Sequence, residues 1–231
     1  MFRETGKRFP RKFIPTKTMK HTKISFLLVF AAAGLSGLVA TGCNSMDGRN
    51  EASASAAADT DASYMKLNAT LTSAIARLES IHDNAGSPEN FLSVVKSVQD
   101  SVSDDASTVA KARADLKASG DKQVARMQEE SSKINNPDLA KDFVAKSEKL
   151  RGYYADYDKE SAELGDHLAT GFNALNDAKV AVGANPTDAV VKLAQDSVSK
   201  AISAYKDAKG DIPDAQKALR TLREQQPRVL K

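Results

Sequence analysis

The chain has 231 residues, of which 27% are charged and 41% are apolar, proportions that exclude neither a folded domain nor a sizeable core. Its formal net charge of +3 comes from residues 1–42, which hold eight basic residues and one acidic residue. The remainder has 25 basic and 29 acidic residues, a net charge near −4, so composition offers no basic surface for nucleic acid.

The first 42 residues contain a basic, an apolar and a small-residue segment in that order. Residues 19–23 are mainly basic, residues 24–33 form an apolar run, and small residues follow as far as Gly42. This order is typical of a secretory signal peptide, so we expect residues 1–42 to be removed. We also expect translation to start at Met19. If it starts at Met1, the chain has a long basic leader and its membrane targeting is unchanged.

Cys43 follows the signal directly and is the only cysteine, which excludes an intramolecular disulfide and a four-cysteine zinc site. Gly42-Cys43 resembles the box that lipoprotein signal peptidase recognises, although Ala40 stands where leucine is usual. The sequence therefore predicts lipidation of Cys43. Two alternatives stay open: cleavage without a lipid, and an uncut anchor, because residues 24–42 just reach across a bilayer. Asn44 is not the aspartate that retains lipoproteins in the inner membrane of enteric bacteria, so we expect the outer membrane, facing the periplasm.

Residues 43–60 are small and polar and have no apolar period. The pattern predicts a lipidated cysteine followed by a flexible tether with a reach of about 20 to 25 Å. The tether would hold a helical domain, residues 61–231, close to the membrane.

From Asp61 onward, apolar residues recur every three or four positions, which predicts helices. The first helix runs to about residue 83. Ser87-Pro88-Glu89 supplies an N-cap, a proline in the first turn and an acid, so a second helix starts there and runs to about Lys133. Asn135-Asn136-Pro137-Asp138 repeats this chemistry and predicts a third helix to about Val182.

A fourth helix follows the turn at residues 183–188. Gly210-Asp211-Ile212-Pro213 predicts a break or kink in it, because proline in a helix interior removes a hydrogen bond and clashes with the preceding turn. A short last helix from about Pro213 to Gln226 completes the chain.

The short turn at Asn136-Pro137 makes the second and third helices an antiparallel hairpin, in which Val98 faces Phe172 and Gly120 faces Leu150 and Tyr153. Since the first and fourth helices look too short to cover it, residues 112–160 are expected to project. The predicted fold is therefore all-α: an antiparallel four-helix bundle with a protruding long helical hairpin, a coiled coil. The alternative is a dimer whose partner covers the hairpin.

Two histidines lie after the signal. His82 ends the first helix, where a partly cationic ring meets the negative end of the helix dipole. His167 has Glu163 one turn before it and Asp104 and Asp105 predicted opposite. The Glu-x-x-His motif of carboxylate-bridged metal bundles is lacking, so we expect a salt-bridged face there and no metal site.

Tyr153, Tyr154 and Tyr157 form the main aromatic cluster. We expect them to belong to the core and its flank, with a docking spot for a small molecule or partner as the alternative. No cysteine nucleophile, serine triad or glycine-rich phosphate loop is apparent. The sequence therefore predicts no catalytic residues, no cofactor and no enzyme activity.

The segment from Met127 to Asn185 resembles an uncharacterised family of bacterial exported coiled-coil proteins, defined as a domain of unknown function. The resemblance is carried by Tyr153-Tyr154, by Leu164-Gly165-Asp166-His167-Leu168-Ala169-Thr170-Gly171-Phe172 and by the turn at Gly183-Ala184-Asn185. It covers under half of the chain after the signal. It implies an exported helical protein and supplies no activity.

Together these patterns predict a membrane-tethered lipoprotein of the cell envelope that acts as a structural or protein-interaction module. Its expected partners are the bilayer, through acylated Cys43, and an envelope protein or a second copy of the chain. Nucleic acid is not expected. The alternative function is a helical bundle that binds a lipid or another apolar small molecule.

Overall fold

The structure, a computed structural model, describes residues 46–84 and 86–230. The predicted signal peptide, the start at Met19, the lipidation at Cys43 and the sorting position Asn44 lie outside the described residues. The described part is helical and contains no strand, which confirms the all-α class. Its helices are α1 (Met46–Asp83), α2 (Pro88–Ser131), α3 (Pro137–Glu160), α4 (Ala162–Ala184) and α5 (Asp188–Leu230). None of these helices is both long enough and apolar enough to cross a bilayer.

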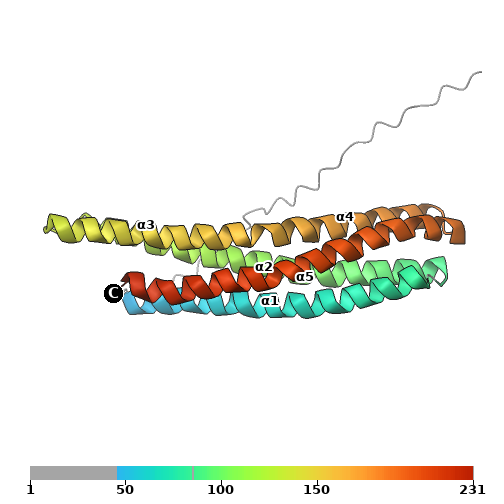
Figure 1. The fold of residues 1–231 in the computed structure, drawn as a ribbon, viewed down its shortest axis with the longest axis horizontal. Coiled ribbons are helices and arrows are strands. Elements are labelled where there is room, and N and C mark those ends of the chain that lie inside the picture. The colour runs from blue at the N-terminus through green and yellow to red at the C-terminus, as the bar shows by residue number, and fades with distance from the viewer. Residues whose placement is uncertain (1–45, 85, 231) are drawn as a thin grey trace, which may run out of the picture. The chain divides into compact units, whose positions relative to one another are not determined.

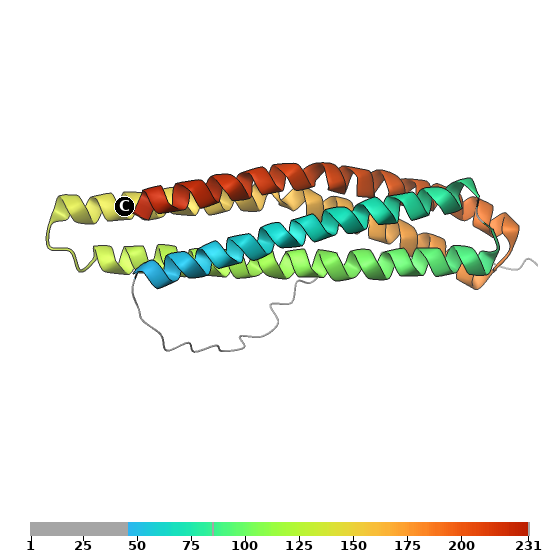
Figure 2. The same cartoon turned by 90° about the horizontal axis from the view of Figure 1, so that it is seen from below.

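The helices lie side by side along one long axis (Figures 1 and 2). The helix α1 packs against α2 and α5, while α5 also packs against α3 and α4. Their shared core is rich in leucine, valine and alanine, and its fully buried large side chains include Tyr64, Leu67, Leu71, Phe91, Leu116, Leu150, Leu175, Tyr205 and Leu219. This packing defines one helical domain, residues 46–230.

Two helix starts that the sequence predicts are confirmed at the atomic level. Ser87 is the N-cap of α2, and its Oγ accepts a hydrogen bond from the backbone N–H of Asn90 at 3.3 Å. Asn136 is the N-cap of α3, and its Oδ1 accepts from the N–H groups of Asp138 and Leu139 at 3.0 and 3.2 Å. Both caps satisfy backbone donors that the first helical turn leaves without partners, so the chain can reverse in a very short connection.

The start of the helical domain differs from the prediction of a flexible tether over residues 43–60. The helix α1 already begins at Met46. Its buried side extends from Tyr64 back through Thr60, Ala57 and Ser53, all at most 1% exposed. These positions continue the seven-residue repeat with small or hydroxyl side chains, which a search for large apolar residues overlooks. Alanine is also the best helix former, so the segment needs little packing to be helical.

The predicted single helix over residues 137–182 is interrupted at Ser161, which separates α3 from α4. Arg113 of α2 donates from Nη1 to the carbonyl oxygen of Ser161 at 2.9 Å and from Nη2 to the Asp158 side chain at 3.1 Å. The Ser161 hydroxyl donates to the carbonyl oxygen of Tyr157 at 2.8 Å. Side chains that compete for backbone carbonyls in this way locally disturb a helix.

The predicted break at residues 210–213 is wrong, since α5 runs without interruption from Asp188 to Leu230. Pro213 lies on the exposed side of the helix, where water can reach the carbonyl group that the proline leaves without a donor. On the opposite side, the apolar repeat passes straight through this region as Ala208, Ile212, Ala215 and Leu219, each at most 2% exposed. Burial of that stripe outweighs the local cost of the proline.

Because α1 and α5 are longer than predicted, residues 112–160 do not project as a whole. Thr60 of α1 donates to the carbonyl oxygen of Ala112 at 3.2 Å, and Gln226 of α5 donates to Gln123 Oε1 at 2.8 Å. Only the turn end of α2 and α3 reaches beyond the start of α1 and the end of α5 (Figure 2). We call the segment 128–148 the hairpin tip.

The predicted pairing of α2 with α3 and α4 is close to the observed one. Gln99 Nε2 donates to the carbonyl oxygen of Phe172 at 3.4 Å, one residue from the predicted pairing of Val98 with Phe172. Gly120 does leave room for a large side chain, but that side chain is Tyr154 rather than Leu150 or Tyr153. A Cβ atom built on Gly120 would lie 2.5 to 2.7 Å from atoms of the Tyr154 ring.

Replacement of Gly120 by alanine should therefore destabilise the domain by about 1 to 2 kcal/mol, since overpacking outweighs the better helix propensity of alanine. Gly152 is the matched control, because a Cβ there has no neighbour within 4 Å. Gly152→Ala should stabilise the domain by about 0.5 to 1 kcal/mol. Urea unfolding followed by circular dichroism measures both effects. A Gly120→Ala variant as stable as Gly152→Ala would contradict the close fit.

Candidate functional site

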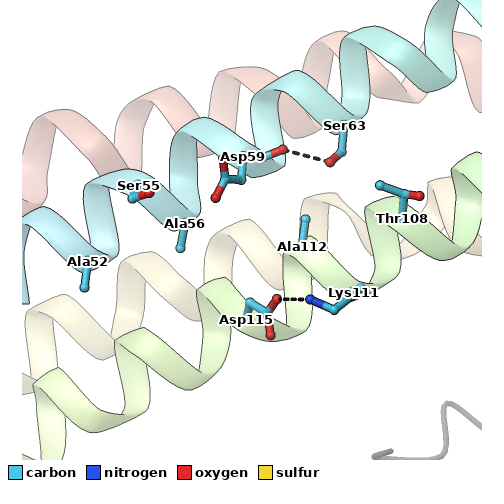
Figure 3. Close-up of a pocket in the computed structure, with 9 residues that line it drawn as sticks. All are labelled: Ala52, Ser55, Ala56, Asp59, Ser63, Thr108, Lys111, Ala112 and Asp115. Carbon is cyan, nitrogen blue, oxygen red and sulfur yellow. Dashed lines mark hydrogen bonds and ion pairs between the residues drawn. The ribbon is translucent and has the colours of Figure 1, made fainter. Parts of the chain in front are cut away.

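A shallow groove runs between the first half of α1 and the middle of α2 (Figure 3). One part of it has a volume of about 490 Å³, and an adjoining part of about 350 Å³ shares Ala52, Ala56 and Asp115 with the first. We call the two together the α1–α2 groove. Its lining consists of Ala52, Ser55, Ala56, Asp59 and Ser63 from α1 and Thr108, Lys111, Ala112, Asp115, Ala118, Ser119, Lys122 and Gln123 from α2.

The groove exists because small side chains face each other across the two helices. The methyl groups of Ala52, Ala56 and Ala112 point into the space between α1 and α2 (Figure 3). Beneath them, the Thr60 hydroxyl donates to the carbonyl oxygens of Ala56 at 2.7 Å and Ala112 at 3.2 Å. This hydrogen bonding joins the two backbones without filling the surface above them.

Charged side chains border the groove. Lys111 Nζ and Asp115 Oδ2 form an ion pair at 2.9 Å, with side chains 80% and 61% exposed. Such an exposed pair contributes little to stability. The groove lining contains no histidine or cysteine, so its chemistry is that of a contact surface: methyl groups and hydroxyls with charges at the rim.

The predicted aromatic cluster does not line one shared pocket. Tyr154 Oη lies 2.8 Å from Ser53 Oγ, and Tyr157 Oη lies 2.9 Å from Tyr64 Oη, so both side chains bond to α1. Tyr153 instead donates to Gln225 Oε1 of α5 at 3.5 Å. These contacts support the prediction that the tyrosines belong to the core and its flank.

The buried phenols stay protonated. Burial raises the pKa of Tyr154 and of Tyr64, in each case against an opposing hydrogen bond. Burial also raises the pKa of Tyr157, and the neighbouring Tyr64 adds to the effect. Neutral hydroxyls can act as both donor and acceptor, which suits them to join α3 to α1.

His167 does not face Asp104 and Asp105 of α2, and this part of the prediction is wrong. Its Nδ1 lies 2.7 Å from Asp211 Oδ2 of α5. Asp105 points to α1 instead, where it contacts Lys66 Nζ at 2.8 Å and accepts from Thr70 at 2.6 Å. The prediction failed because it placed α2 opposite a face of α4 that α5 covers.

The two ionisable groups respond to these partners in opposite directions. Burial by itself would raise the pKa of Asp105, but hydrogen bonds from Lys66 and Thr70 outweigh it and hold the pKa below its usual range. The hydrogen bond to Asp211 raises the pKa of His167, and the nearby carboxylates of Asp207 and Glu163 act in the same direction. Within residues 46–84 and 86–230, no three His, Cys, Asp or Glu side chains are grouped to hold a metal ion.

His82 lies in the last turn of α1, as the sequence predicts. Its Nδ1 is 3.2 Å from Asp83 Oδ1, and its backbone carbonyl accepts a hydrogen bond from Gln195 of α5 at 2.8 Å. Both interactions are structural, and the second helps to hold the ends of α1 and α5 together.

Sequence reasoning missed the α1–α2 groove. The signal that marks it is the small-residue run at positions 52–58, which resembles a linker when it is considered alone. The groove becomes visible only when that run is helical and lies against the alanines of α2. Comparisons of the chain with protein-family models, with curated proteins and with solved structures each gave no match. The resemblance to an exported coiled-coil family stays a prediction.

The ion pair of His167 with Asp211 predicts a pH dependence of stability. A folded-state pKa above the ordinary 6.5 means that the stabilisation is fully present below 6.5 and is lost as pH rises through the folded value. The free energy of unfolding, measured in urea across this range, should show that decline. His167→Gln and Asp211→Asn should each remove it. A decline that persists unchanged in both variants would assign it to another group.

Proposed function

We propose that this chain is a membrane-tethered lipoprotein of the cell envelope, located in the outer membrane and facing the periplasm, whose helical domain is a structural or protein-interaction module. The proposed architecture is an antiparallel four-helix bundle with a protruding hairpin. The contacts of α1 with α2 and α5, and of α5 with α3 and α4, support the bundle. The reach of the hairpin tip beyond the other helix ends supports the protrusion (Figure 2).

The membrane attachment is supported by the order of basic, apolar and small residues that ends at Gly42-Cys43. Several acyl chains on one cysteine give practically permanent attachment, since each buried methylene contributes about 0.8 kcal/mol. The proposed anchor therefore needs no spanning helix in the domain itself.

The observation that carries the interaction role is the α1–α2 groove. Small side chains let the backbone of a second helix approach closely, and a helix laid in a groove is a common mode of recognition. The rim charges of Asp59, Lys111 and Asp115 can fix the orientation of such a helix, since electrostatic complementarity mainly affects specificity. We propose a helix of an envelope protein as the occupant.

The alternative, a bundle that binds a lipid or another apolar small molecule, depends on interior space near the tyrosines. The rings of Tyr154 and Tyr157 are at most 8% exposed, and their hydroxyls are bonded to Ser53 and Tyr64. No observation favours this alternative over the interaction module. An enzymatic role is not proposed.

Replacement of Cys43 by serine tests the anchor, because serine lacks the thiol that receives the lipid. We expect the chain with its native Cys43 to sediment with the envelope membranes and to carry the mass of its acyl chains. The variant should lack that mass and move to the supernatant. Membrane association that survives Cys43→Ser would refute a lipid as the anchor.

The groove is tested by a photo-crosslinking residue at Ser55, which lines it and is exposed. Adducts of defined mass should form in the living cell, and Ala52→Arg should suppress them because the long side chain fills the groove. Ala58→Arg is the matched control, since Ala58 is an exposed alanine of the same helix outside the lining. If Ala52→Arg and Ala58→Arg leave the same adducts, the groove is not the contact surface.

A further inference from the structure

The hairpin tip and the start of α1 lie at the same end of the helical domain (Figure 2). The Thr60 hydroxyl of α1 donates to the carbonyl oxygen of Ala112 of α2 at 3.2 Å, so these two residues lie at nearly the same level along the long axis. From that level, α1 extends back to Met46 and α2 extends forward to Ser131, both toward the turn between α2 and α3. The start of α1 and the end of α2 therefore lie at similar levels along the long axis.

The rise per residue of an α-helix gives the difference between the reach of α1 and the reach of α2 toward this end. Fourteen residues separate Thr60 from Met46, which is ~21 Å at ~1.5 Å per residue. Nineteen residues separate Ala112 from Ser131, which is ~28 Å by the same rise, and the turn then adds several more residues. The hairpin tip therefore extends roughly 5 to 10 Å past the start of α1.

The proposed anchor, Cys43, is close in sequence to the start of α1 at that end. Only Asn44 and Ser45 separate Cys43 from Met46. Three peptide steps span at most ~11 Å even when the chain is fully extended. A lipid on Cys43 thus holds the start of α1 at a distance from the bilayer that matches the extra reach of the hairpin tip.

The tip presents apolar side chains there. Leu139 is 49% exposed and Val144 is 42% exposed, while Phe143 between them is half-buried against the core. Apolar exposure alone does not identify a membrane contact, because Val180 and Leu193 at the opposite end are more exposed. The position of the anchor distinguishes the two ends.

We propose that the hairpin tip touches the surface of the bilayer that holds the lipid, with Leu139 and Val144 inserted at the level of the headgroups. This inference rests on the proposed lipidation of Cys43. The domain then contacts the membrane at two points, the acylated cysteine and the hairpin tip. Its long axis points away from the membrane. A contact too weak to recruit a free protein is sufficient here, because the tether keeps the tip at high local concentration.

The charges at the tip are consistent with a zwitterionic surface. Lys133 pairs with Glu129 at 2.5 Å, and Lys146 pairs with Asp142 at 3.1 Å. The segment 128–148 as a whole has five acidic and three basic residues, so it has no net attraction to anionic lipids. Its contact should therefore depend on apolar insertion and hardly on salt.

The test uses the full chain, produced in a bacterial host and purified in detergent. Leu139→Cys and, as the matched far-end control, Leu193→Cys are labelled with an environment-sensitive fluorophore, while the lipid protects Cys43. Each protein is reconstituted into phosphatidylcholine vesicles with brominated acyl chains, which quench only probes that reach the membrane. Circular dichroism checks that both variants are helical.

We expect the probe at position 139 to be quenched several-fold more than the probe at position 193, with little change at high salt. Equal quenching at the two positions, in protein whose mass shows acylated Cys43, would overturn the tip contact and leave the anchor intact. Purified protein that lacks the lipid mass would overturn the anchor and this orientation with it. The two failures are therefore distinguishable.

Discussion

The first turns of α1 are held against α2 and α3 by hydrogen-bonded hydroxyl groups rather than by large apolar side chains. Ser53 bonds to Tyr154 of α3, and Thr60 bonds to a backbone carbonyl of α2. Burying a hydroxyl is costly unless its hydrogen bond is made, so these contacts require one register of α1. Most of what distinguishes the domain follows from this constraint.

One consequence is the α1–α2 groove. Helices joined by hydroxyls and alanines approach each other closely but leave their outer surface hollow. Another consequence is the position of the helix start, because the same contacts keep α1 ordered back to Met46. Only two residues then separate the proposed anchor at Cys43 from α1, in place of the long flexible tether that the sequence predicts. The proposed interaction surface and the proposed contact of the tip with the membrane thus share a physical origin.

Two glycines also allow close packing of the helices. Gly120 accommodates the ring of Tyr154, and Gly171 of α4 accommodates the ring of Tyr205 of α5. Tyr205 is fully buried, and its hydroxyl has no hydrogen-bond partner among the residues that the structure describes. Burial raises the pKa of Tyr205, so this phenol stays neutral. In a core with few aromatic residues, two of the buried rings thus lie opposite a glycine.

The sequence by itself determined the all-helical class, the capped starts at Ser87 and Asn136 and the approximate pairing of Val98 with Phe172. These features depend on local chemistry: periodicity, a side-chain cap and a proline in a first turn. Tertiary structure decided the rest. Pro213 lies within an intact helix because burial of Ile212 and its neighbours outweighs a local cost, and Ser161 interrupts a helix because Arg113 of another helix binds its carbonyl. His167 meets Asp211 rather than Asp105, and residues 52–60 fold as a helix, because the partners that decide both outcomes are distant in the chain and near in space.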